Sequence, residues 1–466
     1  MNLVRNWKPI VELFKKRLSI WKAKTLSYGG RITLIKAVLS SLPTYFFSLY
    51  KAPGQVLKHL ESLRRVFFWG GTEEDSKMSW MAWDNVVAPV KYGGLGFGSL
   101  RDANLSMLAK WWWRFKTEPD CLWRKVVWSI HYSSRSWNYI PTKLSIAGPW
   151  KNIFNIAPLL SNKGVDIEKT IFGVVHGGND VAFWVDTWVG SQPLLYVFPL
   201  LFQLEKEKRC TVADRLQTRV SGVSWVWNWR RQLSDAAEFS ELQHLNSMLG
   251  SVSVSGNVDR WRWMLDPSNG FSVASIKRVI QCHNRDPNAY VVEWNNWVPK
   301  KVGIVAWRAE KERLPTRDAL ERRGVTVQST ECIICREYPE TSDHLLVSCG
   351  YAQIVWQALF QWCKTHPILA FSLRDILDSY KQLDGSKERR KAFHAVCLVT
   401  VWSIWNMRNE LMFRGKDKSV NNIVEEIKTK SFLWIKNRSK NLELTLEHNY
   451  IILYVYIYSE RCNFPM

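Results

Sequence analysis

The amino-acid sequence predicts a mainly α-helical protein with minor β structure, an α+β arrangement. Apolar residues recur at helical spacing in the first seventy residues and again near residues 104–115. A tryptophan-rich middle stretch combines a short strand-like run with a helical one, and a compact group of three cysteines and one histidine follows it. The predicted order is therefore a basic helical region, a Trp-rich middle region, a small module around the cysteines, and C-terminal helices.

The composition fits a folded and strongly basic protein. Of its 466 residues, 46% are hydrophobic and 23% charged, which allows about two to four domains with cores of their own. Lys and Arg total 64 against 42 Asp and Glu, a net charge of +22, and half of that excess lies within residues 1–71. The charge predicts nucleic acid as the partner, with an anionic membrane surface as the weaker alternative.

The sequence also predicts a compartment. Lys or Arg interrupts every apolar stretch in the first thirty residues, so no secretory signal peptide is expected. No apolar run reaches the roughly 18 residues needed to cross a bilayer. We therefore expect an intracellular protein, nuclear or cytoplasmic, without membrane association. In a reducing compartment, metal binding is a more natural use of clustered cysteines than disulfide formation.

Two helices are predicted in the basic N-terminal stretch. The first follows a turn at residues 27–30, ends at Pro43 and carries apolar residues at helical spacing: Ile32, Ile35, Leu39 and Leu42. The second follows Pro53 and has one apolar face: Val56, Leu60, Leu63 and Phe67. Its basic residues Lys58, Arg64 and Arg65 are expected on other faces, within reach of phosphates or simply of solvent.

A glycine cluster at residues 93–98 superficially resembles a phosphate loop. It lacks the G-x-G-x-x-G spacing and the Gly-Lys-Ser/Thr ending, and no strand-then-helix context accompanies it. We interpret it as a turn before a helix at about residues 104–115. The apolar stripe of that helix consists of Leu105, Leu108, Trp112 and Phe115. Core packing explains its tryptophans without a ligand.

The middle and the end of the chain give weaker signals. Residues 181–185 (VAFWV) predict a short buried strand, followed by a turn at Gly190 and Pro193. Residues 235–249 predict a helix. Residues 450–458 form an uncharged, β-prone run that is too short to span a membrane.

The strongest chemical signal is the spacing C-x2-C-x8-H-x4-C formed by Cys332, Cys335, His344 and Cys349. Thiolates and imidazole at this spacing are typical of a structural Zn²⁺ site, and four protein ligands leave no position for a reacting water. The alternative is two buried cysteines beside an unrelated histidine and cysteine. Residues five apart on a helix lie about 140° apart. We therefore expect the helix to be interrupted near Cys349 and Gly350.

No intrinsic catalytic site is predicted. A polymerase needs clustered carboxylates to hold two Mg²⁺ ions, and the sequence contains no adjacent Asp pair. Asp186 stands alone within FWVDTW, so we interpret it as a turn or hydrogen-bonding residue. The motifs of serine hydrolases and zinc proteases are also missing from the sequence.

Seven stretches carry a resemblance to a known family. They are residues 18–43 (LSIWKAKTLSYGGRITLIKAVLSSLP), 67–71 (FFWGG), 93–115 with GGLGFGSL and KWWWRF, 183–194 (FWVDTWVGSQPL), 260–273 (RWRWMLDPSNGFSV) and 298–325, with VWSIWNMRN at 401–409 after the cysteines. In this order they resemble the C-terminal region of plant LINE-type (non-LTR) retrotransposon reverse transcriptases, including the reverse-transcriptase zinc-binding domain.

The resemblance implies an organisation along the chain. The expected regions are a basic, thumb-like helical region at 1–71, a Gly/Trp-rich helical region at 72–145, a Trp-rich mixed region at 146–267, the zinc-binding domain at 268–363, a C-terminal helical region at 364–440 and a tail at 441–466 that resembles nothing in the family. In the family, a polymerase palm precedes the region where this chain begins. The resemblance therefore implies a region that binds nucleic acid but does not copy it.

Basic residues are the expected contacts to RNA or DNA, largely independent of sequence because Lys and Arg bind phosphates. The candidates form two groups: Lys22, Lys24, Arg31 and Lys36 near the first helices, and Lys300, Lys301, Arg308, Arg317, Arg322 and Arg323 beside the cysteine module. Two alternatives stay open, a domesticated zinc-dependent protein-interaction module and a translated pseudogene without function. The sequence assigns no protein partner.

Overall fold

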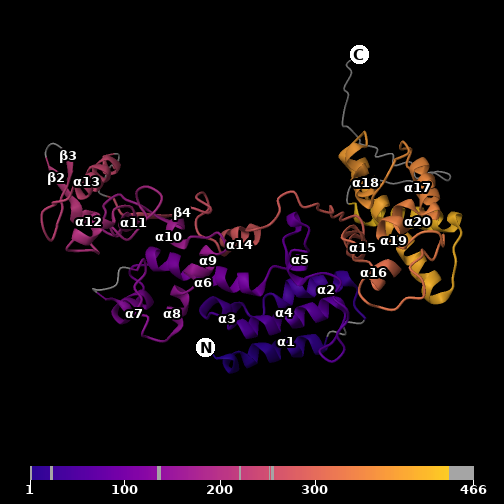
Figure 1. Ribbon diagram of the computed structural model, residues 1–466, viewed down its shortest axis with the longest axis horizontal. Helices are drawn as coiled ribbons and strands as arrows, with labels where there is room; N and C mark the ends of the chain where they lie inside the picture. Colours follow the sequence, from indigo (N-terminus) through magenta and orange to yellow (C-terminus); the bar gives the residue numbers. More distant parts are fainter. Residues whose placement is uncertain are drawn as a thin grey trace, which may run out of the picture. The chain divides into compact units, whose positions relative to one another are not determined.

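The computed structural model describes residues 3–20, 25–133, 138–219, 222–250, 252 and 257–439. These residues are mainly helical with two small antiparallel sheets, which confirms the predicted fold class (Figure 1). They form two compact units that alternate along the chain. Unit 1 is drawn from Met1–Ile20, Lys36–Arg64 and Val87–Pro287, and unit 2 from Trp21–Ile35, Arg65–Val86 and Asn288–Met466. The region boundaries expected from the resemblance remain predictions.

Unit 1 contains most of the helices in the first three fifths of the chain. They are η1 Val4–Trp7, α1 Lys8–Ile20, η2 Ile35–Leu39, α3 Thr44–Leu49, α4 Gly54–Trp69, which continues into unit 2, η3 Val90–Tyr92, α6 Leu100–Thr117, α7 Leu122–His131, α8 Pro149–Phe154, α9 Ala157–Ser161, α10 Ile167–Thr170, α11 Leu194–Val197, α12 Pro199–Leu204, η4 Ala213–Arg215, α13 Ala236–Leu249 and α14 Val273–Cys282. The predicted helix at 235–249 is confirmed as α13, which begins after a capping box at Asp235.

Helix α6 organises the core of unit 1. It begins where the Ser99 side chain accepts N–H bonds from Arg101 and Asp102, just after the glycine turn. Its predicted apolar stripe is buried, with Leu108 and Trp112 fully inaccessible. The helix packs against α3, α8 and α14. The sequence periodicity therefore predicted the face of this helix correctly.

The named strands in the described part of unit 1 form two short antiparallel pairs. Strand β1 (Ile171–Val174) pairs antiparallel with β4 (Arg260–Trp263), and β2 (Leu216–Arg219) pairs antiparallel with β3 (Gly222–Trp225). The strand predicted at residues 181–185 is wrong, because Ala182 forms only an isolated bridge with Thr211 and residues 183–185 form a turn. The Asp186 carboxylate accepts the Ala182 N–H at 2.8 Å and closes that turn, which confirms its structural role. The run is apolar because most of its side chains lie in the core, and its pairing is limited to the Ala182–Thr211 bridge.

Helix α4 corrects one expectation about basic residues. Its apolar face is buried as predicted, and Lys58 and Arg65 are exposed. Arg64, however, is fully buried. Its guanidinium pairs with Glu61 at 3.0 Å and donates to the Gly98 carbonyl at 3.2 Å. The Arg64 side chain therefore stabilises the packing of the glycine turn and is not available to phosphates.

The regular elements in the described part of unit 2 are all helices, joined by turns and loops. Its elements are α2 Tyr28–Leu34, the end of α4, α5 Trp83–Val87, α15 Lys300–Glu310, α16 Arg317–Glu321, η5 His344–Ser348, α17 Gly350–Trp362, α18 Leu373–Asp378, η6 Ser379–Gln382, α19 Lys387–Arg414 and α20 Val420–Arg438. The long helix α19 packs against α15, α18 and α20, and α17 packs against α20, as the orange and yellow ribbons of Figure 1 show. One continuous core joins residues 292–435.

The N-terminal part of unit 2 surrounds a buried arginine of α15. The Arg308 guanidinium lies 5.4 Å from the Tyr28 ring centroid and 5.7 Å from those of Trp69 and Trp80. Arg31 donates to the Phe68 carbonyl at 3.0 Å in the same region. Cation–π contacts and hydrogen bonds thus hold α2 and the end of α4 on α15.

In the described part of the chain, none of the helices combines the length and the apolar character needed to span a bilayer. The predicted β-prone run at 450–458 and the tail at 441–466 lie outside the described residues.

We expect the Asn104→Ala substitution to destabilise unit 1. The Asn104 side chain accepts the Ala52 N–H at 2.9 Å and donates to the Phe47 and Tyr50 carbonyls at 3.0 and 2.9 Å. The alanine leaves buried backbone groups without partners, at a cost of about 2–4 kcal/mol. Urea unfolding followed by circular dichroism measures the change. Asn246→Ala, an exposed change on α13, is the control, and equal midpoints for the two variants would contradict the prediction.

Candidate metal centre

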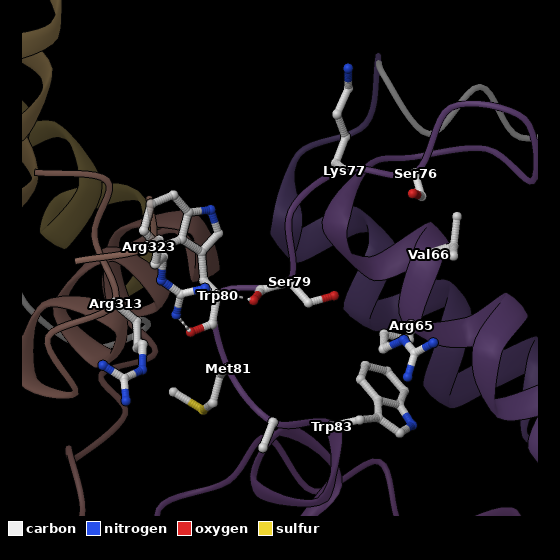
Figure 2. A pocket seen from close by; sticks show the side chains of 11 residues that line it. Arg65, Val66, Ser76, Lys77, Ser79, Trp80, Met81, Trp83, Arg313 and Arg323 are labelled. Carbon is white, nitrogen blue, oxygen red and sulfur yellow. Dashed lines mark hydrogen bonds between the residues drawn. The ribbon is translucent and has the colours of Figure 1, made fainter. Parts of the chain in front are cut away.

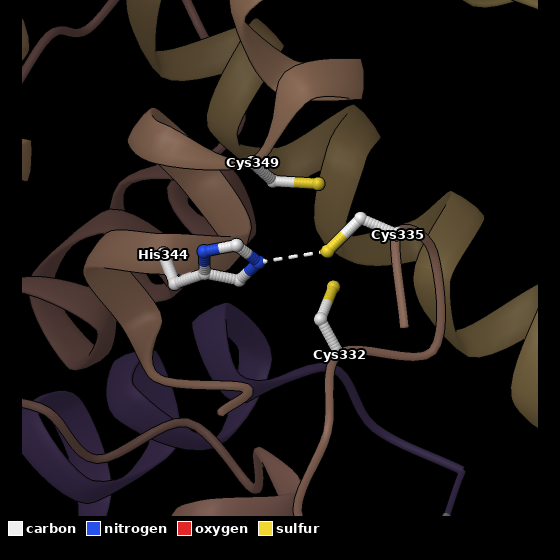
Figure 3. Close-up of side chains that lie close together, drawn as sticks. All are labelled: Cys332, Cys335, His344 and Cys349. Carbon is white, nitrogen blue, oxygen red and sulfur yellow. Dashed lines mark hydrogen bonds between the residues drawn. The ribbon is translucent and has the colours of Figure 1, made fainter. Parts of the chain in front are cut away.

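Four side chains of unit 2 converge on one point. The thiol sulfurs of Cys332, Cys335 and Cys349 and a ring nitrogen of His344 all lie within 4.8 Å of one another (Figure 3). The Cys335 Sγ to His344 Nε2 distance is 3.2 Å. Cys332 and Cys349 are fully buried. The residues predicted as metal ligands from their spacing are therefore brought together.

A tight turn positions the first two cysteines. The Cys332 N–H donates to the Tyr338 carbonyl at 2.7 Å, and the Arg336 N–H donates to the Cys332 carbonyl at 2.9 Å. Arg336 takes a left-handed backbone conformation with φ of 60°. The N–H groups of Ile334 and Cys335 donate to the Cys332 sulfur. This turn places Cys332 and Cys335 on the same side of the loop.

The other two candidate ligands stand at a break between helices. His344 begins the π-helical turn η5, Cys349 is extended with ψ of 132°, and α17 starts at Gly350. The predicted interruption is confirmed. The Thr341 hydroxyl accepts the His344 N–H at 3.0 Å, and the Ser348 hydroxyl lies 3.4 Å from His344 Nδ1. That contact orients the ring so that Nε2 faces the sulfurs.

The electrostatic surroundings favour metal-binding protonation states. Burial lowers the pKa of His344, which keeps its imidazole neutral at pH 7. A hydrogen bond from the Cys332 thiol lowers the pKa of Cys349, and the N–H groups of Tyr351 and Ala352 at the start of α17 act in the same direction. The same thiol–thiol hydrogen bond, followed by burial, raises the pKa of Cys332. A cation placed among these sulfurs would deprotonate both.

The donor set fits zinc. Three sulfurs and one imidazole nitrogen are a common structural zinc set, and Zn–S bonds of about 2.3 Å in a tetrahedron place sulfurs about 3.8 Å apart. The observed clustering within 4.8 Å matches that size. Cys332, Cys335, His344 and Cys349 would hold the ion, and with four protein ligands its role would be to stabilise the fold.

A buried carboxylate between the ligands anchors the cluster. Glu340 is fully inaccessible and forms a 2.5 Å ion pair with Arg408 of α19. It also accepts the Arg317 N–H at 2.9 Å and the Ile333 N–H at 3.4 Å. Glu340 thereby connects the cysteine turn to α16 and α19. Sequence reasoning missed this pair, although an arginine within an apolar helix was a usable signal.

The structure separates the predicted nucleic-acid contacts into accessible and buried ones. Lys36, Lys300, Lys301, Arg322 and Arg323 are exposed. Arg317 is half-buried and donates to the Glu331 carbonyl. Lys22 and Lys24 lie outside the described residues.

Two of the predicted contacts need correction. Arg31 and Arg308 are buried, at 8% and 7% exposure, and their guanidinium groups contact aromatic rings and backbone carbonyls. They stabilise the packing of unit 2 and are too buried to contact phosphates. Of the exposed residues, Arg322 pairs with Asp318 and Glu312, which reduces its local positive charge.

Purified protein is expected to contain one zinc ion per chain, and the double substitution Cys332→Ser/Cys335→Ser to contain none. Two thiolates are lost from a four-ligand set, which removes most of the binding free energy. Mass spectrometry of metal content measures both. Cys121→Ser changes a cysteine outside the cluster and should keep the zinc. A wild-type chain without zinc would refute the assignment.

Arg408→Met should destabilise unit 2 by about 3–5 kcal/mol, because it leaves the Glu340 carboxylate buried without its cation. The double change Arg408→Met/Glu340→Gln removes both charges and should recover part of the loss. Thermal unfolding of the zinc-loaded protein measures each variant. A single variant as stable as wild type would show that the pair does not support unit 2.

Comparisons with known proteins place the cluster in a family. Residues 271–356, which include all four candidate ligands, match the family described as zinc-binding in reverse transcriptase. A putative ribonuclease H protein of Arabidopsis thaliana is 27% identical over 412 residues, covering 86% of this chain and 63% of that protein. The chain thus spans less than two thirds of that relative.

A second relative matches a shorter segment. An uncharacterized mitochondrial protein of Arabidopsis thaliana is 30% identical over 152 residues, covering 32% of this chain and 93% of that protein. Together with the ligand cluster, these similarities confirm the resemblance drawn from the sequence. The chain belongs to the reverse-transcriptase family of plant retroelements and includes the segment that carries the family's zinc-binding domain.

Proposed function

We propose that this chain is a nucleic-acid-binding region of a LINE-type (non-LTR) retrotransposon reverse transcriptase, and that a structural zinc ion stabilises its unit 2. The observation that carries the proposal is the convergence of Cys332, Cys335, His344 and Cys349 inside the segment that matches the family. The zinc would act in folding, since four protein ligands leave it no open position. The bound ion would hold the cysteine turn against α19.

RNA or DNA is the proposed partner, and the contacts are largely independent of sequence. The net charge of +22 supports this choice, because a polyanion releases counterions when Lys and Arg neutralise its phosphates. Lys300 and Lys301 stand exposed at the start of α15, where they can reach a phosphate backbone. Arg322 and Arg323 follow α16 on the same unit.

We propose that this region positions nucleic acid without copying it. Its sequence contains no adjacent pair of Asp residues to hold two Mg²⁺ ions. The Asp186 carboxylate, the most prominent lone acid, is buried and paired with Lys116. A primer-extension assay with the purified chain should therefore give no product.

The binding affinity for RNA or DNA is expected to fall steeply as salt increases. Each phosphate contact contributes a slope of about −0.9 for duplexes, or about −0.7 for single strands, to a plot of log K against log salt concentration. Fluorescence anisotropy with labelled strands between low and physiological salt measures the slope. Lys300→Gln/Lys301→Gln should reduce its magnitude by roughly 1.4–1.8.

The control is Lys428→Gln/Lys430→Gln, which removes two cations of α20 that already form ion pairs with Glu425 and Glu426. It should change the slope less than the α15 pair does. Binding that does not depend on salt would favour a protein-interaction module over a nucleic-acid-binding region.

A further inference from the structure

Unit 2 contains a pocket that the metal centre does not explain. Its volume is about 510 Å³, within the range of small-ligand sites. Eleven residues line it, from the end of α4, the following segment and α5 on one side, and from the segments around α16 on the other (Figure 2). The pocket therefore joins parts of the chain more than two hundred residues apart.

The lining is strongly cationic. Four of the eleven lining residues are basic, namely Arg65, Lys77, Arg313 and Arg323, and none of the eleven is acidic. Asp75 lies outside the lining and pairs with Lys77 at 3.2 Å in an exposed surface contact. Such pairs contribute little free energy and exchange readily. An anion inside the pocket would thus meet a net positive field.

One of these cations, Arg323, is held in place by the backbone and an aromatic ring. Arg323 donates to the Ser79 and Trp80 carbonyls at 3.0 and 2.6 Å, and its guanidinium lies 4.7 Å from the Trp80 ring centroid. Burial and the neighbouring Arg313 charge lower the pKa of Arg323. A bound anion would relieve that repulsion between the two guanidinium groups. Because Arg323 is held by the backbone, little conformational entropy is lost when it binds.

The opposite wall provides an aromatic surface. Trp83 is half-buried and tilts against Phe68 at 6.0 Å between ring centroids. Figure 2 shows Arg65 and Trp83 on this wall and Arg313 and Arg323 on the other. A ligand that fits both walls carries an anionic group and a flat ring.

We propose that this pocket binds one nucleotide of a single-stranded nucleic acid, its phosphate among Arg65, Arg313 and Arg323 and its base against Trp83. The inference rests on the proposed function. It adds which site on unit 2 binds the nucleic acid, and that the nucleic acid bound there is single-stranded. Bases of a duplex are stacked on each other and cannot enter such a pocket, whereas an unpaired base can stack on an aromatic side chain.

The test compares a short labelled oligo(dT) strand with a duplex of the same sequence, using the zinc-loaded full chain and fluorescence anisotropy. Trp83→Leu should weaken single-strand binding by roughly 5- to 150-fold, as expected for loss of one stacked base, with the salt slope and duplex affinity unchanged. Trp83→Phe keeps a ring and should retain most of the affinity. Trp128→Leu, on a half-exposed tryptophan of unit 1, is the aromatic control.

The charge variants test the phosphate side of the pocket. Arg65→Gln/Arg313→Gln should reduce the magnitude of the single-strand salt slope by roughly 1.4. The matched pair Lys58→Gln/Lys125→Gln removes two exposed cations outside the pocket and should weaken binding less. Thermal unfolding of every variant verifies that unit 2 remains folded.

Three outcomes would overturn the inference while the proposed function stands. They are wild-type-like single-strand binding by Trp83→Leu, an equal loss of duplex binding, and adenosine monophosphate binding as tightly as the strand, which would make the pocket a site for free nucleotides. If the wild-type chain binds no nucleic acid at all, the proposed function itself fails, and the pocket's assignment fails with it.

Discussion

The carboxylate of Glu340 connects the metal-ligand segment to the rest of unit 2. An ionised carboxylate buried at 0% exposure is costly unless donors surround it, and here the Arg408 guanidinium and the Arg317 and Ile333 N–H groups do so. These donors come from α19, α16 and the cysteine turn. Glu340 thus both orients the cysteine turn, through the Ile333 N–H, and attaches it to α19, through Arg408. One buried carboxylate therefore contacts both the segment of the candidate metal ligands and the packed helices α16 and α19.

The segment that matches the zinc-binding family is shorter than unit 2, the compact unit to which most of it belongs. The match covers residues 271–356, whereas the core of unit 2 extends to Ile435 and includes the buried faces of α19 and α20. On the N-terminal side, Tyr28, Trp69 and Trp80 surround Arg308. Removing these parts would expose the apolar side of α15 and leave the Arg308 charge without its aromatic neighbours. The structural unit is therefore assembled from three separate stretches of the chain.

Local features of the sequence predicted the helices and the candidate ligands, because their evidence is contained in short windows. The spacing of Cys332, Cys335, His344 and Cys349 brought four ligand atoms together, and periodicity identified the buried faces of α4 and α6. Features that depend on distant partners were not predictable in this way. In the sequence, Arg64 and Arg308 cannot be told from surface cations. Their burial follows from distant partners, the Gly98 carbonyl for Arg64 and the Trp69 ring for Arg308. The run at 181–185 looks like a strand because burial in a core also produces an apolar sequence where pairing is limited to one isolated bridge. The Arg65–Trp83 pocket combines residues that no local pattern connects.

The alternation of the two units along the chain has a consequence for synthesis on the ribosome. Residues 21–35 and 65–86 belong to unit 2, but their partners begin only at residue 288. Roughly 200 residues must be made in between, which takes about 10–40 s at typical elongation rates. During that interval the aromatic side chains around Tyr28, Phe68 and Trp69 lack the surface that covers them in the finished fold. Unit 1 can begin to fold before residues 21–35 and 65–86 have met their partners in unit 2. The nascent chain therefore exposes an apolar, aromatic surface for a limited time. Such a surface is prone to aggregate, and chaperones at the ribosomal exit tunnel bind surfaces of this kind.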